Sequence, residues 1–432
     1  MSLNPEEAVA RELAPLLDHT EAPVPKIGVA VSGGSDSIAL LHLTCGWARQ
    51  HGASVLAATV DHGLRPESAT EAVAVAQASA ALGIAHVTLE WKNWDGQGNL
   101  QAMARAARRR LLAQWAEDAG LGSVLLGHTA DDQAETFLMR LARGSGVDGL
   151  SGMGVWDNHR LFGRPLLGVT RAALRDWLEQ RKISWVDDPS NEDPRFDRVK
   201  ARQMLAALAP LGLTLDRLND TAAHMTRARS TLWRAAADWS VRLVRADVGD
   251  LVLAPEVLWL GNSDVEARLF AAAIQWIGGA GYRPRYDALR DAAEALRRGE
   301  ARTLGGVLML PEGTGGARLT REPAAAQGPV PAHDGAGDIT PWDGRWHLRR
   351  IAAAKGQTVP GDAPGPWQIA ALGAAGLAAC KGWRSCGVPR VSLLGSPAVW
   401  ARGTLVAAPL AGEANGWQAD LGQTFHSFIL SH

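Results

Sequence analysis

The sequence predicts an α/β fold: a doubly wound parallel sheet, followed by a mainly helical domain and a small C-terminal domain. Three observations support this prediction. Short apolar runs alternate with longer helical stretches over the first 150 residues, which is typical of consecutive βαβ units. A glycine-rich turn joins the first apolar run to the first of these helices. Polar motifs follow several of the apolar runs, and ligands bind at the carboxyl ends of parallel strands.

The expected strands and helices follow one another in a regular order. Strands are expected at Lys26–Val31, Ser54–Asp61, Ala85–Trp91 and Ser123–His128. Helices are expected at Ile38–Arg49, Glu67–Leu82, Leu100–Asp118 and Asp132–Arg143. A fifth apolar run, Leu161–Leu167, could add an edge strand, and Thr170 is placed to cap a helix that runs to Lys182.

The turn after the first strand, Ser32-Gly33-Gly34-Ser35-Asp36-Ser37, is the most informative segment. The backbone N–H groups of such a turn, together with the start of a helix, hold an anion. Compared with the phosphate loop of an ATPase, Gly28 and Gly33 are correctly spaced, but Gly34 stands where the lysine should be. We therefore expect the turn to hold a pyrophosphate while chemistry occurs at the α-phosphate. An ordinary Ser/Gly turn is the alternative.

A second polar motif, GHTADDQAET, occupies 127–136, at the end of the fourth strand and the start of the next helix. Asp132 and Glu135 are three residues apart and therefore share one helical face. Their carboxylates could hold Mg²⁺ on the phosphates or take a proton from an attacking amine. His128, at the strand end, is a candidate substrate-binding residue. The alternative is an acidic first turn that the helix dipole favours.

The helix expected at Leu100–Asp118 carries several arginines. Asn99 could cap its N-terminus, and the apolar residues define the side facing the core, which leaves Arg105 and Arg108 on the exposed side. A solvated basic helix face is one interpretation of this pattern. A role of these two arginines in a site is implied by the resemblance to an enzyme family given below. The apolar residues are Leu100, Met103, Ala107, Leu111 and Trp115.

The charge distribution along the chain says more than the total charge. The net charge of −1 and the 47% hydrophobic content are those of an ordinary globular protein. Residues 1–150 carry 11 Lys/Arg against 17 Asp/Glu, whereas residues 160–245 carry 16 against 10. An acidic catalytic domain beside a basic segment fits a polyanionic partner, with Arg198, Lys200 and Arg202 as candidate phosphate contacts. The alternative is a solvated basic helical surface.

Composition also bears on compartment and domain boundaries. Three cysteines without a C-x-x-C pair are too few for a disulfide framework. No signal pattern or long apolar run is visible, so a cytoplasmic protein without a membrane partner is expected. The expected domains are a catalytic domain at 1–215, a mainly helical domain at 216–312, a Gly/Pro/Ala-rich linker at 313–338 and a small domain at 339–432.

Several ordered motifs resemble one enzyme family. SGGSDS resembles the PP-loop of the N-type ATP pyrophosphatases, which transfer AMP to an oxygen and release pyrophosphate. GHTADDQAET, the following RGSGVDGLSGM and the run Arg164-Pro165-Leu166-Leu167 together resemble the tRNA(Ile)-lysidine synthetases. Trp185–Asn191 and Phe196–Arg202 extend the match, which covers about residues 26–202 closely.

Two positions depart from the family pattern. Thr59 stands where a histidine usually begins the motif that continues as Asp61-His62-Gly63-Leu64-Arg65. Arg109 stands where a tyrosine is usual, so any role that rests on that tyrosine is in doubt.

The resemblance implies a reaction in two steps, with ATP and Mg²⁺ as cofactors. The 2-oxygen of the wobble cytidine of tRNA(Ile) with a CAU anticodon attacks the α-phosphate of ATP and releases pyrophosphate. The ε-amino group of free L-lysine then attacks carbon 2 and displaces AMP, which leaves lysidine and allows AUA to be decoded as isoleucine. The target base must leave its stack to be reached.

The resemblance also implies roles for the candidate residues. The backbone of Ser32–Ser37 would hold phosphates, Asp36 and Asp132 would handle Mg²⁺, and Arg105 would stabilise charge on the reacting phosphorus. Asp132 and Glu135 would hold or deprotonate the lysine ammonium. Substrate contacts are expected from Arg108, His128, Arg198, Lys200 and Arg202.

Three other functions would each need features that bear on this sequence. A PP-loop tRNA thiolase would need catalytic or cluster-binding cysteines, and the expected catalytic domain has only Cys45. An amidating synthetase that uses ammonia would need a glutaminase nucleophile or a tunnel partner, and neither is visible. A regulatory nucleotide-binding module without turnover would not need Asp36, Arg105, Asp132 and Glu135 together.

Overall fold

The computed structural model describes most of the chain, and the contacts within it define two compact units, Met1–Arg229 and Ser230–His432. The described residues are 4–17, 25–63, 68–92, 100–157, 160–187, 197–261, 263–279, 283–333, 337–351 and 366–431.

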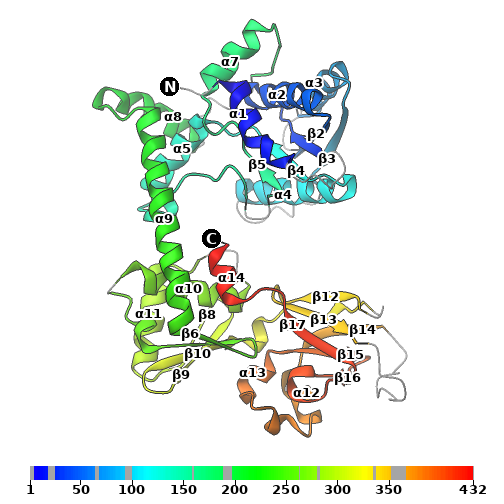
Figure 1. The fold of residues 1–432 in the computed structure, drawn as a ribbon, viewed down its shortest axis with the longest axis vertical. Coiled ribbons are helices and arrows are strands. Elements are labelled where there is room, and N and C mark those ends of the chain that lie inside the picture. Colours follow the sequence, from blue (N-terminus) through cyan, green and yellow to red (C-terminus); the bar gives the residue numbers. More distant parts are fainter. Residues whose placement is uncertain are drawn as a thin grey trace. The chain divides into compact units, whose positions relative to one another are not determined.

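The first unit contains a five-stranded parallel sheet with the strand order β3-β2-β1-β4-β5 (Figure 1). This confirms the doubly wound fold class. Val29 in the central strand lies opposite Ala57 on one side and Leu125 on the other. The strand order reverses between β1 and β4, so the turns that follow these two strands meet at one crevice. The strands are β1 Lys26–Ala30, β2 Ser54–Asp61, β3 Ala85–Glu90, β4 Ser123–Leu126 and β5 Phe162–Gly163.

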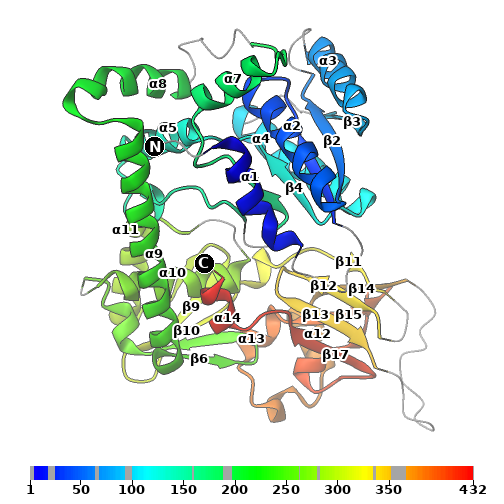
Figure 2. The ribbon, with the colours of Figure 1, turned by 45° about the horizontal axis from the view of Figure 1, so that its top comes forward.

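Helices cover both faces of this sheet. Helices α1, α2 and α7 share a buried apolar cluster with β1, and α1 and α2 lie in front of the strands in Figure 2. Helix α4 packs on the other face, where a Cβ at Gly28 would lie 2.7 Å from the Trp115 ring. Gly28 therefore serves packing rather than phosphate binding. The helices are α1 Pro5–Leu13, α2 Ser35–His51, α3 Ser68–Ala81, α4 Leu100–Ala119, α5 Ala130–Leu141, α6 Val147–Leu150, α7 Arg171–Gln180, α8 Asp197–Leu208 and α9 Leu215–Leu243.

The second unit begins with an antiparallel sheet in the order β6-β7-β10-β9-β8. Helix α10 is buried along most of its length and shares one apolar core with the sheet, α11 and the end of α9. The elements are β6 Val244–Asp247, β7 Asp250–Leu253, η4 Pro255–Leu258, α10 Asp264–Gly278, α11 Tyr286–Arg297, β8 Arg302–Leu304, β9 Val307–Glu312 and β10 Gly316–Arg321.

The rest of the second unit contains two further sheets, ordered β11-β14-β15-β16 and β12-β13-β17. Trp342, Trp346 and Trp417 are buried in the core that these sheets share and are packing residues there. The elements are β11 Val330–Pro331, β12 Ile339–Trp342, β13 Trp346–Arg350, β14 Trp367–Ala371, α12 Gly373–Ala379, α13 Arg390–Leu394, β15 Pro397–Ala401, β16 Thr404–Ala407, β17 Trp417–Leu421 and α14 Phe425–Leu430.

The structure differs from the expected domain boundaries in this unit. Segment 313–338, which composition indicated to be a linker, contains β10, which pairs with both β7 and β9. Its glycines form a tight turn, in which Gly313 and Gly315 have φ of 62° and 91°. From β10, Arg318 lies 3.0 Å from the carboxylate of Asp250, in β7. Segment 216–312 is mainly helical, as expected, through α9, α10 and α11, and it also contributes the short strands β6 to β9 to the sheet.

No helix among the described residues is both long enough and apolar enough to cross a bilayer.

Candidate active site

The phosphate loop between β1 and α2 is held by its own serine side chains. Gly33 has a φ of 91°, a backbone conformation that favours glycine. The Ser37 hydroxyl accepts a hydrogen bond from the backbone N–H of Ser32 at 3.1 Å and donates to the carbonyl of Gly34 at 3.0 Å. Gly34 is the N-cap of α2 without a side chain that could satisfy the first N–H groups. The loop thus presents a positive helix end to an anion.

Part of the family-like segment Trp185–Asn191 lies against this loop. The backbone N–H of Val186 donates to the carbonyl of Gly33 at 3.0 Å. Arg175 donates a hydrogen bond to the carboxylate of Asp187 at 2.6 Å, and this contact fixes the position of Asp187, the residue after Val186. Residues 188–191 and Phe196 lie outside the described residues, as do Leu64, Arg65 and Asn99.

The start of α5 forms the other wall of the crevice. Thr129 and Asp132 make a capping box, in which the Thr129 N–H donates to Asp132 Oδ2 at 2.9 Å and the Asp132 N–H is 3.4 Å from Thr129 Oγ1. The helix dipole and this cap account for the position of Asp132 without a ligand. They do not account for Glu135, which is buried one turn further along.

Gly127 allows the two walls to approach closely. A Cβ there would lie 3.1 Å from the backbone of Asp36 and Ser37. We expect Gly127→Ala to shift the start of α2, to weaken ATP binding and to lower the free energy of unfolding by about 1–3 kcal/mol, as overpacking does. Denaturant unfolding and the KM for ATP measure the two effects.

The matched control is Gly46→Ala within α2, the helix whose start Gly127 approaches. At Gly46 nothing lies within 4 Å of the added Cβ. It should raise stability by about 0.5–1 kcal/mol, the usual gain for Gly to Ala inside a helix. Equal effects of the two variants would contradict the account of Gly127.

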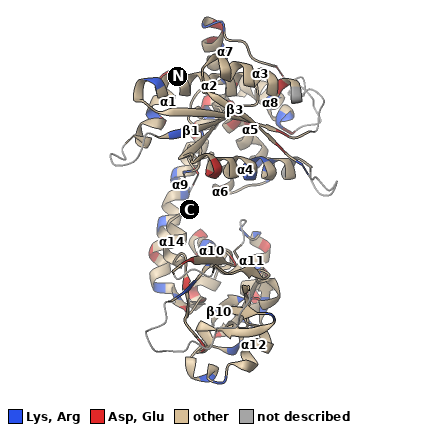
Figure 3. Ribbon diagram, turned by 90° about the vertical axis from the view of Figure 1, so that its right-hand side faces the viewer, with Lys and Arg blue, Asp and Glu red and all other residues tan. Residues whose placement is uncertain are grey.

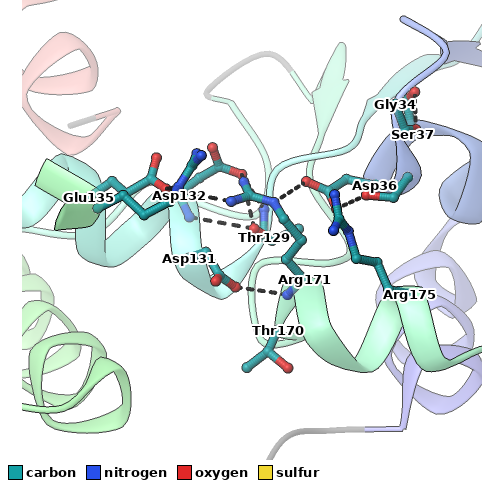
Figure 4. A network of polar contacts seen from close by, with 12 residues as sticks. Gly34, Asp36, Ser37, Thr129, Asp131, Asp132, Glu135, Thr170, Arg171 and Arg175 are labelled. Atoms are coloured by element: carbon teal, nitrogen blue, oxygen red, sulfur yellow. Dashed lines mark hydrogen bonds and ion pairs between the residues drawn. The ribbon is translucent and has the colours of Figure 1, made fainter. Parts of the chain in front are cut away.

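Arg171 joins the two walls, and sequence reasoning missed it. Its Nε donates to Asp36 Oδ2 at 3.0 Å, while its terminal nitrogens lie 3.8 Å from Asp132 and 3.6 Å from Glu135 (Figure 4). Its own backbone N–H donates to Asp131 Oδ2 at 2.8 Å. One local signal was available: a cation in the first turn of a helix opposes the helix dipole, so an arginine directly after the Thr170 cap indicates a carboxylate partner.

The three carboxylates differ in their electrostatics. Burial raises the pKa of Asp36 despite its contact with Arg171. Burial also raises the pKa of Glu135, although Arg202 opposes it. For Asp132, burial is outweighed by the hydrogen bond from the Thr129 backbone and by the charges of Arg171 and Arg198, so the pKa is lowered. Asp132 is therefore the carboxylate held most firmly in its charged form.

Two of the three basic residues of α8 face these carboxylates. Arg202 Nε donates to Glu135 Oε1 at 3.0 Å, and Arg198 lies 3.6 Å from Asp132. Lys200 instead lies exposed and 3.8 Å from Asp197 of the same helix. The three residues, expected to act as one phosphate-binding cluster, therefore have different surroundings.

The basic residues of α4, marked blue in Figure 3, also have different environments. Arg105 is exposed, as expected, whereas Arg108 is half-buried, and burial followed by the charges of Arg105 and Arg198 lowers its pKa. Arg109 pairs with Asp157 at 2.7 Å and lies 4.9 Å above the Phe162 ring. The arginine at the family's tyrosine position thus ties α4 to the edge strand.

His128 lies beside this arginine group as a neutral side chain. Burial lowers its pKa to about 4, with Asp132 opposing and with Arg164, Arg108 and Arg198 adding to the effect. Its Nδ1 is buried and has no hydrogen-bond partner among the described residues. A neutral imidazole with an unused nitrogen is suited to a polar substrate atom rather than to a phosphate charge.

The carboxylate oxygens of this site could bind Mg²⁺ only if a nucleotide supplied further ligands. Within the described parts of the chain, no group of three or more His, Cys, Asp or Glu side chains could hold a metal ion. Asp36 and Asp132 supply carboxylate oxygens from opposite walls, linked through Arg171. Mg²⁺ is commonly bound by one or two carboxylates plus substrate phosphates, so these two residues fit a nucleotide-bound ion.

Comparisons with known proteins agree with this geometry. The PP-loop domain family matches residues 5–208. A tRNA(Ile)-lysidine synthase of Ruegeria pomeroyi is 45% identical over 431 residues, covering 96% of this chain and 98% of that protein. The enzyme of the same name in Rhodopseudomonas palustris is 38% identical over 70% of this chain and 89% of its own. That of Rhizobium meliloti is 36% identical over 82% of this chain and 79% of its own.

Proposed function

The chain belongs to the tRNA(Ile)-lysidine synthase family of PP-loop ATP-utilising enzymes, and from this premise we propose how its site carries out the ligation. L-lysine is joined to carbon 2 of the wobble cytidine of tRNA(Ile) with a CAU anticodon. ATP is consumed, and AMP and pyrophosphate are released. One observation supports this most strongly. The phosphate loop, whose sequence lacks the lysine of an ATPase loop, lies beside three carboxylates that Arg171 joins, those of Asp36, Asp132 and Glu135.

In the first step the cytosine 2-oxygen attacks the α-phosphorus, and the bond to the pyrophosphate oxygen breaks. The loop at Ser32–Ser37 holds the leaving pyrophosphate through backbone N–H groups at the start of α2. Mg²⁺ held by Asp36 and Asp132 would neutralise phosphate charge. Arg105, exposed on α4, would stabilise charge on the reacting phosphorus, and His128 and Arg108 would contact polar atoms of the tRNA.

In the second step the lysine ε-amine attacks carbon 2, a carbon–nitrogen bond forms, and the carbon–oxygen bond to AMP breaks. The ammonium must first lose a proton. Glu135 is the candidate acceptor because its raised pKa brings it closer to the working pH, as a general base requires. Asp132, held charged, is suited to bind the ammonium rather than to take its proton.

Pyrophosphate release tests this function. Purified protein with ATP should release pyrophosphate only when tRNA(Ile) is present, and added lysine should increase the turnover because it clears the adenylated intermediate. Pyrophosphate release that does not depend on tRNA would contradict the proposal. A thiolase would instead require a sulfur donor for product formation.

The basic face of α8 gives a prediction for tRNA binding. Replacing Arg198 and Lys200 together by alanine should weaken tRNA binding and reduce the slope of log K against log salt by about one per charge removed. Filter binding at several salt concentrations measures this slope. Lys92→Ala is the matched control, because Lys92 is exposed and pairs with Glu90 on the edge strand β3. If the double variant keeps the native slope, these charges are merely solvated.

A further inference from the structure

The guanidinium of Arg171 occupies the position of a cation among the three carboxylates of the site. Each of its three nitrogens contacts a different carboxylate: Nε contacts Asp36 at 3.0 Å, Nη2 contacts Asp132 at 3.8 Å and Nη1 contacts Glu135 at 3.6 Å. Only the first is within hydrogen-bond range. The residue is fixed at its backbone by Asp131, so its side chain can turn while α7 stays in place.

Among the described residues, one carboxylate oxygen of Glu135 has no hydrogen-bond partner. Its side chain is 1% exposed, and Oε1 accepts from Arg202 at 3.0 Å. Oε2 is buried and accepts no hydrogen bond from the part of the chain that the structure describes. An unpaired buried carboxylate oxygen is costly, so it indicates a donor that arrives with a ligand. The chemistry of that oxygen is suited to a primary ammonium.

The phosphate loop offers Arg171 a competing partner when it is filled. Asp36 lies in the first turn of α2, directly after the loop backbone. A triphosphate in the loop places several negative charges beside this turn. Arginine pairs with phosphate oxygens in two-pronged contacts that are stronger than the long contacts at 3.6 and 3.8 Å.

We propose that Arg171 is a gate for the amine substrate: its guanidinium fills the ammonium position among Asp36, Asp132 and Glu135 in the nucleotide-free site and leaves it when a nucleoside triphosphate binds. The proposal rests on the function given above, and it adds an order of binding. The nucleotide binds first, and lysine then finds Asp132 and Glu135 without the Arg171 guanidinium between them, while Arg198 and Arg202 stay in place. This order prevents lysine from occupying a site that cannot yet activate the tRNA.

Binding of radiolabelled L-lysine to the whole protein, without tRNA, tests the gate. Equilibrium dialysis compares lysine affinity with magnesium alone and with magnesium plus α,β-methylene-ATP, which cannot release pyrophosphate. The wild-type protein should bind lysine at least about fivefold more tightly with the analogue, the lower end of usual coupling between sites. Lysine must raise the affinity for the analogue by the same factor, because coupling is reciprocal.

Variants separate a gate from a merely structural residue. Arg171→Gln should bind lysine more tightly than wild type without the analogue, and the analogue should then change its affinity by less than about twofold. Arg171→Lys keeps the charge but has one nitrogen, so it should retain part of the coupling. Arg181→Gln, at the end of the same helix and paired with exposed Glu6 at 2.8 Å, is the control and should keep full coupling.

The outcomes distinguish this inference from the proposed function. Equal lysine affinity in the wild type with and without the analogue overturns the gate, and so does weaker nucleotide-free binding by Arg171→Gln. If Arg171→Gln fails to fold, the two reciprocal wild-type measurements still decide. If lysine is incorporated into tRNA but the affinity of the protein for lysine is the same with and without the nucleotide analogue, only the gate proposal is wrong. If lysine neither binds nor reacts under any condition, the proposed function is wrong as well.

Discussion

Asp36→Ala should lower tRNA-dependent pyrophosphate release by about 10²-fold or more, because it removes an electrostatic group from beside the reacting phosphates. Asp36 lies in the first turn of α2, and its carboxylate contacts Arg171 rather than apolar core residues. The fold should therefore survive, with an unchanged circular dichroism spectrum. Rapid-quench measurement of pyrophosphate gives the rate.

Two further variants show whether the loss of charge at Asp36 causes that result. Asp36→Asn keeps the size of the side chain and removes the charge, so it should be almost as slow if Asp36 acts as a metal ligand. Asp118→Asn is the control, since Asp118 lies exposed on α4 and accepts from Gln114. Near-normal pyrophosphate release by Asp36→Ala would contradict the assignment of the phosphate site.

Glu135→Gln should keep some tRNA adenylation but slow lysine transfer by about 10²-fold, the lower end for loss of a general base. Adenylated tRNA should then accumulate. The glutamine can still accept from Arg202 through its oxygen, but its amide neither takes a proton nor balances an ammonium charge. Quenched-flow trapping of adenylated and lysine-bearing tRNA measures the two steps separately.

Asp132→Asn is the comparison that tests this division of labour. If Asp132 helps to place Mg²⁺ on pyrophosphate, its variant should be slower in the first step than Glu135→Gln. Glu179→Gln, on the exposed side of α7, should affect neither step. Equal slowing of both steps by Glu135→Gln, or slowing of neither, would show that the two carboxylates do not divide the work in this way.

The crevice could be predicted from the sequence because each of its motifs depends only on residues that are close together in the chain. The order of strands and helices 1–150, the Ser32–Ser37 turn and the capped start of α5 each depend on a few neighbouring residues. Parallel strands place the turns after β1 and β4 at one edge of the sheet, so Asp36 and Asp132 were expected near the same nucleotide. The family resemblance on these motifs is confirmed by a relative that matches almost the whole chain.

Contacts between distant segments could not be read in the same way. Arg171 and Asp36 are 135 residues apart, and no periodicity links them. Arg198 and Arg202 also contact Asp132 and Glu135, because α8 packs against α5, and no local pattern in the sequence pairs these residues. Strand β10 was missed because its flanking glycines are shared by tight turns and linkers.

The central claim is that this site joins lysine to an adenylated base of tRNA(Ile), and mass spectrometry of the product tests it directly. The protein is incubated with ATP, tRNA(Ile) carrying a CAU anticodon, and isotopically labelled L-lysine, and the tRNA is then digested to nucleosides. The account predicts one cytidine per tRNA that carries labelled lysine, with one AMP and one pyrophosphate formed for each. Release of pyrophosphate without labelled lysine in any nucleoside would contradict it.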